Sequence, residues 1–182
     1  MDRIRIHDKY FEPYITAGEI QEAVRRIARE IERDYADSRP LFIAILNGSF
    51  IFAADLFKAL RIPAEVCFIK LASYKGTKST GHVITSIGLD DDVYQRDVII
   101  LEDIIDTGLT LSYLISNLLT REPASCKIMT MFRKPEALAN QVEVDYVGFD
   151  IPNEFVVGYG LDYDGRYRNL TSVGTLAPHV YS

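Results

Sequence analysis

The sequence has little cysteine. Cys67 and Cys126 are the only two among its 182 residues, and neither belongs to a C-x-x-C pair. A disulfide framework and a C-x-x-C metal site are therefore excluded. Each cysteine stands inside an apolar run, which is typical of a small buried hydrophobic side chain in a reducing compartment.

An excess of basic residues is also missing. The formal net charge is -6, the opposite sign from a surface that binds DNA or RNA. No apolar stretch approaches the roughly 20 residues that a membrane-spanning helix needs, and residues 1–6 lack the apolar region of a secretory signal. We therefore expect a cytoplasmic protein whose partners are small molecules, with no nucleic acid and no membrane among them.

The sequence does contain a regular alternation of apolar runs and amphipathic segments. Ile20, Val24 and Ile27 recur at helical spacing, and Thr16 with Glu19 forms a capping-box pattern at the start of that segment. Helices are expected over 16–35, 49–60 and 111–119, and strands over 41–46, 66–71, 98–101, 126–132 and 144–149.

These strands are apolar without polar alternation, which is typical of strands buried on both faces. The expected fold class is therefore α/β, a parallel twisted sheet flanked by helices. The length of the chain suits a single domain over 1–182, with a core at about 16–150. Residues 151–182 and the N-terminal segment are expected to form a small hood beside the sheet. The polar, glycine-flanked segment at about 73–84 is expected to be a lid loop, with an ordinary surface loop as the alternative.

The most informative segment is the junction between a predicted strand and helix at 98–110. In open α/β sheets, ligands bind beyond the carboxyl ends of the strands. Free backbone N–H groups of residues 107–110, with the helix dipole behind them, would cradle a phosphate. Gly108 permits close backbone approach, and the Thr107 and Thr110 hydroxyls add donors.

Three carboxylates, Glu102, Asp103 and Asp106, fall within five positions of this junction. Acidic and threonine residues at such places often serve only as turn or N-cap residues. Three carboxylates at one junction are more than capping requires. Because neighbouring carboxylates repel one another, the cluster favours a site that uses a metal or a polyol ligand.

The segment Leu-Glu-Asp-Ile-Ile-Asp-Thr-Gly-Leu-Thr at 101–110 resembles the donor-binding signature of type I phosphoribosyltransferases. In detail it resembles the hypoxanthine-guanine phosphoribosyltransferases, the 6-oxopurine branch of that family. The resemblance continues at 46–48 (Leu-Asn-Gly), 73–74 (Ser-Tyr), 133–135 (Arg-Lys-Pro), 147–152 (Val-Gly-Phe-Asp-Ile-Pro) and 155–159 (Phe-Val-Val-Gly-Tyr). The last two motifs point to the 6-oxopurine branch.

The resemblance implies purine salvage. A 5-phosphoribosyl group would pass from phosphoribosyl diphosphate to hypoxanthine or guanine with Mg²⁺ as cofactor, giving IMP or GMP and diphosphate. The family also suggests a homodimer or homotetramer. Alternatives are a preference for xanthine or another base, and a non-catalytic regulator that binds the donor. A regulator that binds nucleic acid should carry a basic face, which the net charge of -6 disfavours, and a donor-making kinase lacks a P-loop here.

The resemblance also implies site residues by position. Asp106 matches the general base that takes the proton from purine N7. The residues implied for the donor are Asn47, Gly48, Ser73, Tyr74, Glu102, Asp103, Asp106, Thr107, Gly108, Leu109, Thr110 and Arg168. Those implied for the purine are Lys134, Phe155, Val156 and Asp162, and those for Mg²⁺ are Glu102, Asp103 and Asp162.

Lys134 is the expected selectivity residue, because an ammonium group donates to O6 of a 6-oxopurine and opposes the amine of adenine. Phe155 would stack on the purine ring. Without the resemblance, a solvated lysine and a core phenylalanine would be the simpler interpretations. The donor loop at 46–48 is expected to contain a cis non-proline peptide, and it carries Asn47 where relatives commonly have lysine.

Overall fold

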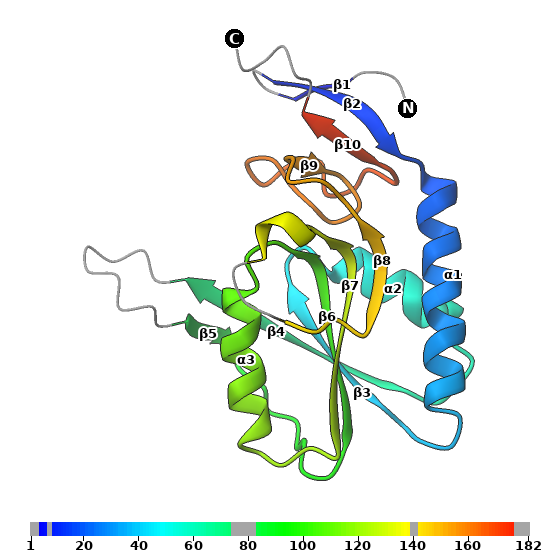
Figure 1. The fold of residues 1–182 in the computed structure, drawn as a ribbon, viewed down its shortest axis with the longest axis vertical. Coiled ribbons are helices and arrows are strands. Elements are labelled where there is room, and N and C mark those ends of the chain that lie inside the picture. The colour runs from blue at the N-terminus through cyan, green and yellow to red at the C-terminus, as the bar shows by residue number, and fades with distance from the viewer. Residues whose placement is uncertain (1–3, 7–8, 74–82, 139–141, 177–182) are drawn as a thin grey trace.

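The computed structural model describes residues 4–6, 9–73, 83–138 and 142–176, which form two sheets and their covering helices (Figure 1). The larger sheet has the strand order β5-β4-β3-β6-β7-β8. Its strands are β3 (Leu41–Leu46), β4 (Glu65–Ser73), β5 (Val83–Ile87), β6 (Asp97–Ile105), β7 (Ser125–Arg133) and β8 (Tyr146–Asp150). All pairs are parallel except β4 with β5, so the expected parallel sheet is confirmed with one antiparallel edge.

Helices cover both faces of this sheet, and α1 and α3 lie on opposite sides of it (Figure 1). They are α1 (Ala17–Asp34), α2 (Phe50–Ala59) and α3 (Leu109–Leu119), followed by the short 3₁₀ helix η1 (Pro135–Ala137). The predicted capping box is present at the start of α1. Thr16 Oγ1 accepts from the Glu19 amide at 3.3 Å, and the Glu19 carboxylate accepts from the Thr16 amide at 2.8 Å.

The core has two halves because successive side chains of a buried strand point to opposite faces. Phe42 and Ala44 of β3 face α1 and α2, where Ile20 and Ile27 are fully buried. The side chains on the other face pack with Leu111, Leu114 and Leu118 of α3. Their strand partners are Leu41, Ile43, Ile45, Ile69, Val98, Ile100 and Ile128.

The second sheet is a four-stranded antiparallel hood with the order β1-β2-β10-β9, placed over the end of the larger sheet at which β8 ends (Figure 1). Its strands are β1 (Ile4–Ile6), β2 (Lys9–Ile15), β9 (Val156–Val157) and β10 (Val173–Leu176). The C-terminal segment and the N-terminal segment thus pair with each other, as the expected hood required. No helix in these described ranges combines the length and apolarity needed to cross a membrane.

The ends of the segment expected as a lid at about 73–84 lie in strands, because Ser73 of β4 pairs with Val83 of β5. Residues 74–82, with Tyr74, lie outside the described residues, so the lid stays a prediction. One expected strand needs correction. The strand expected over 98–101 continues to Ile105. Glu102 and Asp103 therefore stand within β6 rather than after it, since pairing with β7 extends that far along the chain.

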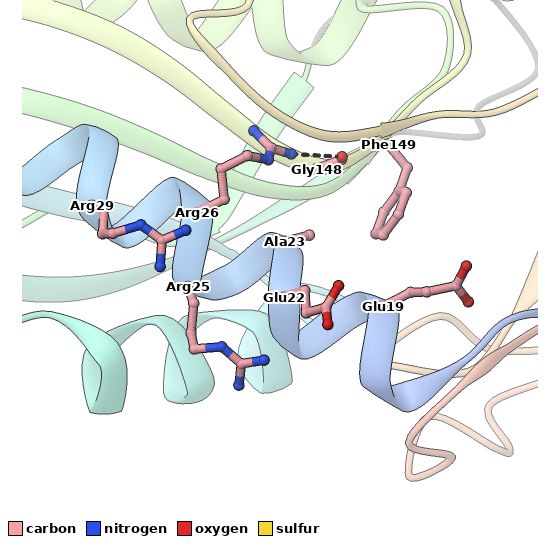
Figure 2. A pocket seen from close by; sticks show the side chains of 8 residues that line it. All are labelled: Glu19, Glu22, Ala23, Arg25, Arg26, Arg29, Gly148 and Phe149. Atoms are coloured by element: carbon pink, nitrogen blue, oxygen red, sulfur yellow. Dashed lines mark hydrogen bonds between the residues drawn. The ribbon is translucent and has the colours of Figure 1, made fainter.

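A pocket of about 520 Å³ lies between α1 and β8 (Figure 2). The Arg26 guanidinium donates to the carbonyl oxygens of Val147 and Gly148 at 2.8 and 2.9 Å. Because β8 is an edge strand, its outward backbone groups have no further strand to pair with. Arg26 therefore satisfies part of the sheet edge, and none of the predicted site residues lines this pocket.

Candidate active site at the ends of the parallel strands

The acidic end of β6 opens into a pocket of about 150 Å³. Glu102 enters it from within the strand, and Asp106 and Thr107 enter from the turn that follows. The complete lining is Glu102, Ile104, Ile105, Asp106, Thr107, Gly108, Leu109 and Leu111. The structure therefore gathers most of the predicted donor segment around one cavity, at the carboxyl end of the sheet where α/β folds bind ligands.

Both acidic residues at this strand end are partly buried, and the Glu102 Oε2 atom is fully buried. Burial, and then the charge of Asp103, raise the pKa of Glu102 well above its usual value. Burial also raises the pKa of Asp103 to about 6, although its bond from the Ile104 amide (2.9 Å) and the charge of Arg168 act in the opposite direction. Two poorly solvated acids side by side are costly for the free protein, which is typical of a site that receives a cation or hydroxyl donors.

The turn after β6 is shaped to receive an anion. Gly108 has φ of 74°, in the left-handed region that glycine adopts readily, and it precedes the first residue of α3. The Ser112 amide donates to the Gly108 carbonyl at 2.9 Å, so the N–H groups before it have no intrahelical acceptor. Thr107 and Leu109 are exposed beside these groups; the Thr110 side chain lies outside the described atoms.

The predicted donor loop after β3 fits against the acidic strand end. The peptide bond between Leu46 and Asn47 is cis, as the resemblance implied. Gly48 lies so close to Asp103 that a Cβ at this position would overlap its carboxylate. Asn47 is exposed next to it. This loop thus borders the Asp103 carboxylate, although Gly48 and Asp103 are 55 positions apart in the chain.

The hood closes this corner of the site. Gly160, with φ of 96°, packs on the Gly48 carbonyl oxygen so tightly that a Cβ there would overlap it. The Arg168 guanidinium pairs with Asp162 at 2.6 Å and donates to the Gly160 carbonyl at 2.7 Å. Asp162 and Arg168 both act electrostatically on Asp103. These two predicted residues therefore belong to the same corner as the donor loop.

Lys134 approaches the site from the end of β7. Its side chain is about 10% exposed, and its ammonium lies 3.4 Å from the Asp106 carboxylate. Its backbone amide donates to the Ile105 carbonyl at 3.0 Å, which fixes the residue beside the turn. A solvated lysine is thus excluded in favour of a buried ammonium group at the site.

Phe155 stands at the start of the hood, with 42% of its surface exposed. Its ring packs on Phe11 of β2 (centroids 6.2 Å apart) and on Tyr163 (5.8 Å), and Val156 beside it is buried in β9. A ring that is supported from behind and exposed in front can stack on a flat ligand. The simpler interpretation of Phe155 as a fully buried core residue is therefore wrong.

The acidic residues suit magnesium. Among the described residues, no group of three or more His, Cys, Asp or Glu side chains is arranged to hold a metal ion. Mg²⁺ needs no such cage, because it is usually bound through one or two carboxylates together with substrate phosphates and water. The Glu102 Oε2 atom is buried without a hydrogen-bond partner. A hard cation bound with its ligand would give that oxygen a partner, so these residues fit the ion.

Several contacts at this site could not be read from the sequence. Phe11 and Thr130 belong to no motif, and Tyr159 ends the 155–159 motif without an expected role, yet each contacts a predicted residue or its neighbour. The Thr130 hydroxyl, for example, is fully buried and lies 3.3 Å from the Asp103 carbonyl. The pattern Gly-Tyr-Gly at 158–160 was the one available signal, since two glycines around a large residue often mark a constrained turn.

Comparison with known proteins defines the class. The model of the phosphoribosyl transferase domain family matches residues 16–164, and this chain belongs to that family. Among its relatives are the hypoxanthine-guanine phosphoribosyltransferases of Mycobacterium avium (47% identical, covering 92% of this chain and 86% of that protein) and Bacillus subtilis (45%, covering 92% and 93%). The crystal structure of a hypoxanthine phosphoribosyltransferase from Staphylococcus aureus superposes with a TM-score of 0.87 at 40% identity, covering 94% of each chain.

Proposed function

We propose that this chain is a purine-salvage enzyme that transfers the 5-phosphoribosyl group of phosphoribosyl diphosphate to hypoxanthine or guanine, with Mg²⁺ as cofactor. The products are IMP or GMP and diphosphate. The observation that carries the proposal is the meeting of three segments at one strand end: the acidic end of β6, the turn after it, and the loop at 46–48. The named relatives act on these bases, which supports the same specificity here.

The turn and the donor loop would position the donor. The free N–H groups of 107–110 bind its 5-phosphate, and the amides near Asn47 and Gly48, together with Arg168, bind its diphosphate. The Glu102 and Asp103 carboxylates accept hydrogen bonds from the ribose hydroxyls. Ser73 and Tyr74 are proposed as further donor contacts from the segment after β4. Each phosphate thus has its own set of donors, which leaves the anomeric carbon between the loop and the purine.

Glu102, Asp103 and Asp162 are proposed to hold Mg²⁺ with the donor, the last through water. The bound ion would stabilise the charge that develops on the departing diphosphate, as a Lewis acid does. During transfer the bond from the anomeric carbon to diphosphate oxygen breaks, and the diphosphate leaves with the electron pair. A new bond from that carbon to the purine forms.

Asp106 is the proposed general base. Its carboxylate is about half exposed at the pocket mouth, and it accepts the proton that purine N7 loses as the new bond forms. Lys134, 3.4 Å from this carboxylate, donates to O6 of the base. Phe155 stacks on the ring, and the Val156 backbone meets its edge. An adenine amine would point a donor at the Lys134 ammonium, which explains selection of 6-oxopurines.

The direct test is a nucleotide-formation assay. The chain is incubated with Mg²⁺, phosphoribosyl diphosphate and one base at a time: hypoxanthine, guanine, xanthine or adenine. We expect IMP and GMP to form, little AMP, and no product when EDTA replaces the metal. Product from xanthine alone would favour the alternative specificity, and no product from any base would favour a donor-binding regulator.

We further propose that the whole chain acts as one domain in the cytoplasm, as a homodimer or homotetramer. Exposed apolar side chains support association: Val66 and Phe68 on β4 are 39 and 40% exposed, and Phe50 on α2 is 42% exposed. Light scattering after size exclusion would measure the mass in solution. A monomer at micromolar concentration would contradict the proposed assembly.

A further inference from the structure

Tyr159 is an unusual residue in the turn of the hood that touches the donor loop. It is 2% exposed and has φ of 50°, between two glycines that also have positive φ. A bulky residue rarely adopts this backbone region, and it does so where the surrounding structure imposes it. Contacts around Tyr159 therefore hold its backbone in this conformation.

The contact that holds Tyr159 reaches across the molecule to α2. Its hydroxyl donates to Asp55 Oδ2 at 3.1 Å, and the same oxygen accepts from Gln21 Nε2 of α1 at 2.8 Å. The other carboxylate oxygen of Asp55 lies 3.3 Å from the Lys58 ammonium. Burial, and then Asp55, raise the pKa of Tyr159, so its hydroxyl keeps the proton that it donates. Asp55 of α2 thus holds this hood side chain, and Gln21 of α1 holds Asp55.

The next residue transmits this position to the donor loop. Gly160 follows Tyr159 directly and packs on the Gly48 carbonyl, and Gly48 in turn abuts the Asp103 carboxylate. The backbone amides of Tyr159 and Gly160 donate to the carbonyls of Leu170 and Arg168 at 2.8 and 2.9 Å. The turn is thereby rigid on its hood side. Because these residues are closely packed, a shift of Tyr159 would also move Gly160 against Gly48.

We propose that Asp55 and Tyr159 are positioning residues for the donor loop: their hydrogen bond sets where Gly48 stands and so how the loop meets the diphosphate. The inference rests on the proposed function for the identity of the ligand. Neither residue touches the donor; both act through Gly160. From the sequence alone, Asp55 would be an ordinary polar residue on the solvent face of α2. In the proposed role it lies outside the site and positions the donor loop through Tyr159.

The structure offers a matched control. Tyr146 is also buried, and its hydroxyl donates to Asp34 of α1 at 2.8 Å. It opens β8, at the end of the sheet opposite to the candidate site. Tyr159→Phe and Tyr146→Phe therefore each remove one hydroxyl that bonds a helix aspartate. If Tyr159 only stabilised the fold, Tyr159→Phe should change the donor KM no more than Tyr146→Phe does.

Two readouts test the proposal. In steady-state assays we expect Tyr159→Phe to raise the donor KM roughly tenfold while kcat and the purine KM change less than about twofold. Tyr146→Phe should leave the donor KM, kcat and the purine KM unchanged, even if its Tm falls as much as that of Tyr159→Phe. Asp55→Ala should reproduce the Tyr159→Phe effect, the two together should not add, and Asp55→Asn, which keeps an acceptor, should restore much of it.

The second readout needs no activity. The sequence has a single Asn-Gly pair, at 47–48, so carbonyl-¹³C asparagine with ¹⁵N glycine labels one amide, that of Gly48. We expect its NMR signal to move in Tyr159→Phe and to stay in Tyr146→Phe. An unmoved signal, or an unchanged donor KM in an active Tyr159→Phe enzyme, overturns the inference. A wild-type chain that makes no nucleotide overturns the proposed function instead, and the Gly48 signal still decides the inference.

Discussion

The Lys134 ammonium and the Asp106 carboxylate form an ion pair of 3.4 Å across the mouth of the candidate site. Lys134 comes from the end of β7 and Asp106 from the turn after β6, so two neighbouring parallel strands deliver the pair. The exposures differ: the Lys134 side chain is about 10% exposed and that of Asp106 about 52%. The ammonium is thus fixed by the protein, while the carboxylate remains open to a ligand.

Asp106→Asn should separate chemistry from donor binding. The amide keeps the size of the side chain but cannot accept a proton, so we expect kcat to fall by roughly 10²–10⁴-fold. The donor KM should change less than about threefold, because the phosphate amides of 107–110 are unaltered. Rapid-quench and steady-state assays measure both quantities. Full activity in the variant would end the assignment of Asp106 as base.

Lys134→Met tests the selectivity residue. Methionine keeps an unbranched, apolar side chain of nearly the same length as lysine and removes the donor. We expect the ratio of kcat/KM for hypoxanthine over adenine to fall at least roughly tenfold. Lys127→Met, which changes another partly buried lysine of β7 that contacts Asp34 instead, is the control and should keep the ratio. Unchanged discrimination in Lys134→Met would remove the proposed role.

Asp103→Asn should stabilise the metal-free protein at high pH. The pKa of this carboxyl is 3.8 in a model peptide and about 6 in the fold, with burial as the main cause. Between these values the native state holds a proton that the unfolded chain has lost, so the free energy of unfolding falls as pH rises through this window. We expect the variant to exceed the wild type by about 1–3 kcal/mol at pH 8.

The difference should vanish well below the model-peptide pKa of 3.8, where the wild-type carboxyl is protonated in both the folded and the unfolded chain. Urea unfolding with EDTA at several pH values measures it. The same variant should be a poor enzyme, because the stabilising change removes a proposed ligand of the ion and ribose. A variant that is less stable than the wild type at pH 8 would show that Asp103 is not strained by burial.

Phe155→Ala tests the stacking surface. Loss of a base-on-aromatic contact costs about 1–3 kcal/mol, so we expect the purine Kd to rise roughly 5–150-fold with little change for the donor. Tyr94→Ala is the control: that ring is 53% exposed and precedes β6, at the far end of the sheet. Titration calorimetry in the presence of donor analogue gives both constants. Equal purine affinity in the wild type and Phe155→Ala would exclude stacking at this residue.

The sequence predicts the part of the fold whose signals are local. Apolar runs such as 41–46 and the capping box at Thr16 appear in the structure, because strand burial and helix capping depend on neighbouring residues. The strands β5 and β2 were not predicted. They are edge or hood elements with mixed polarity, and their pairing depends on partners far along the chain.

The same division holds for the site. The segment 101–110 is contiguous, so its carboxylates, turn and helix start can be recognised together. The pair of Asp55 and Tyr159 spans 104 positions, and Asp55 carries the pattern of an ordinary helix surface residue. The close approach of Gly160 to Gly48 likewise depends on backbone geometry rather than on residue type. Such contacts follow from tertiary packing, which no local pattern encodes.

The most direct test of the account is a crystal structure of the chain with phosphoribosyl diphosphate, Mg²⁺ and an unreactive purine analogue. We expect the 5-phosphate on the amides of 107–110, the ribose hydroxyls and the ion at Glu102 and Asp103, and the diphosphate beside Gly48. A donor bound elsewhere, with this strand end still filled by solvent, would contradict the account.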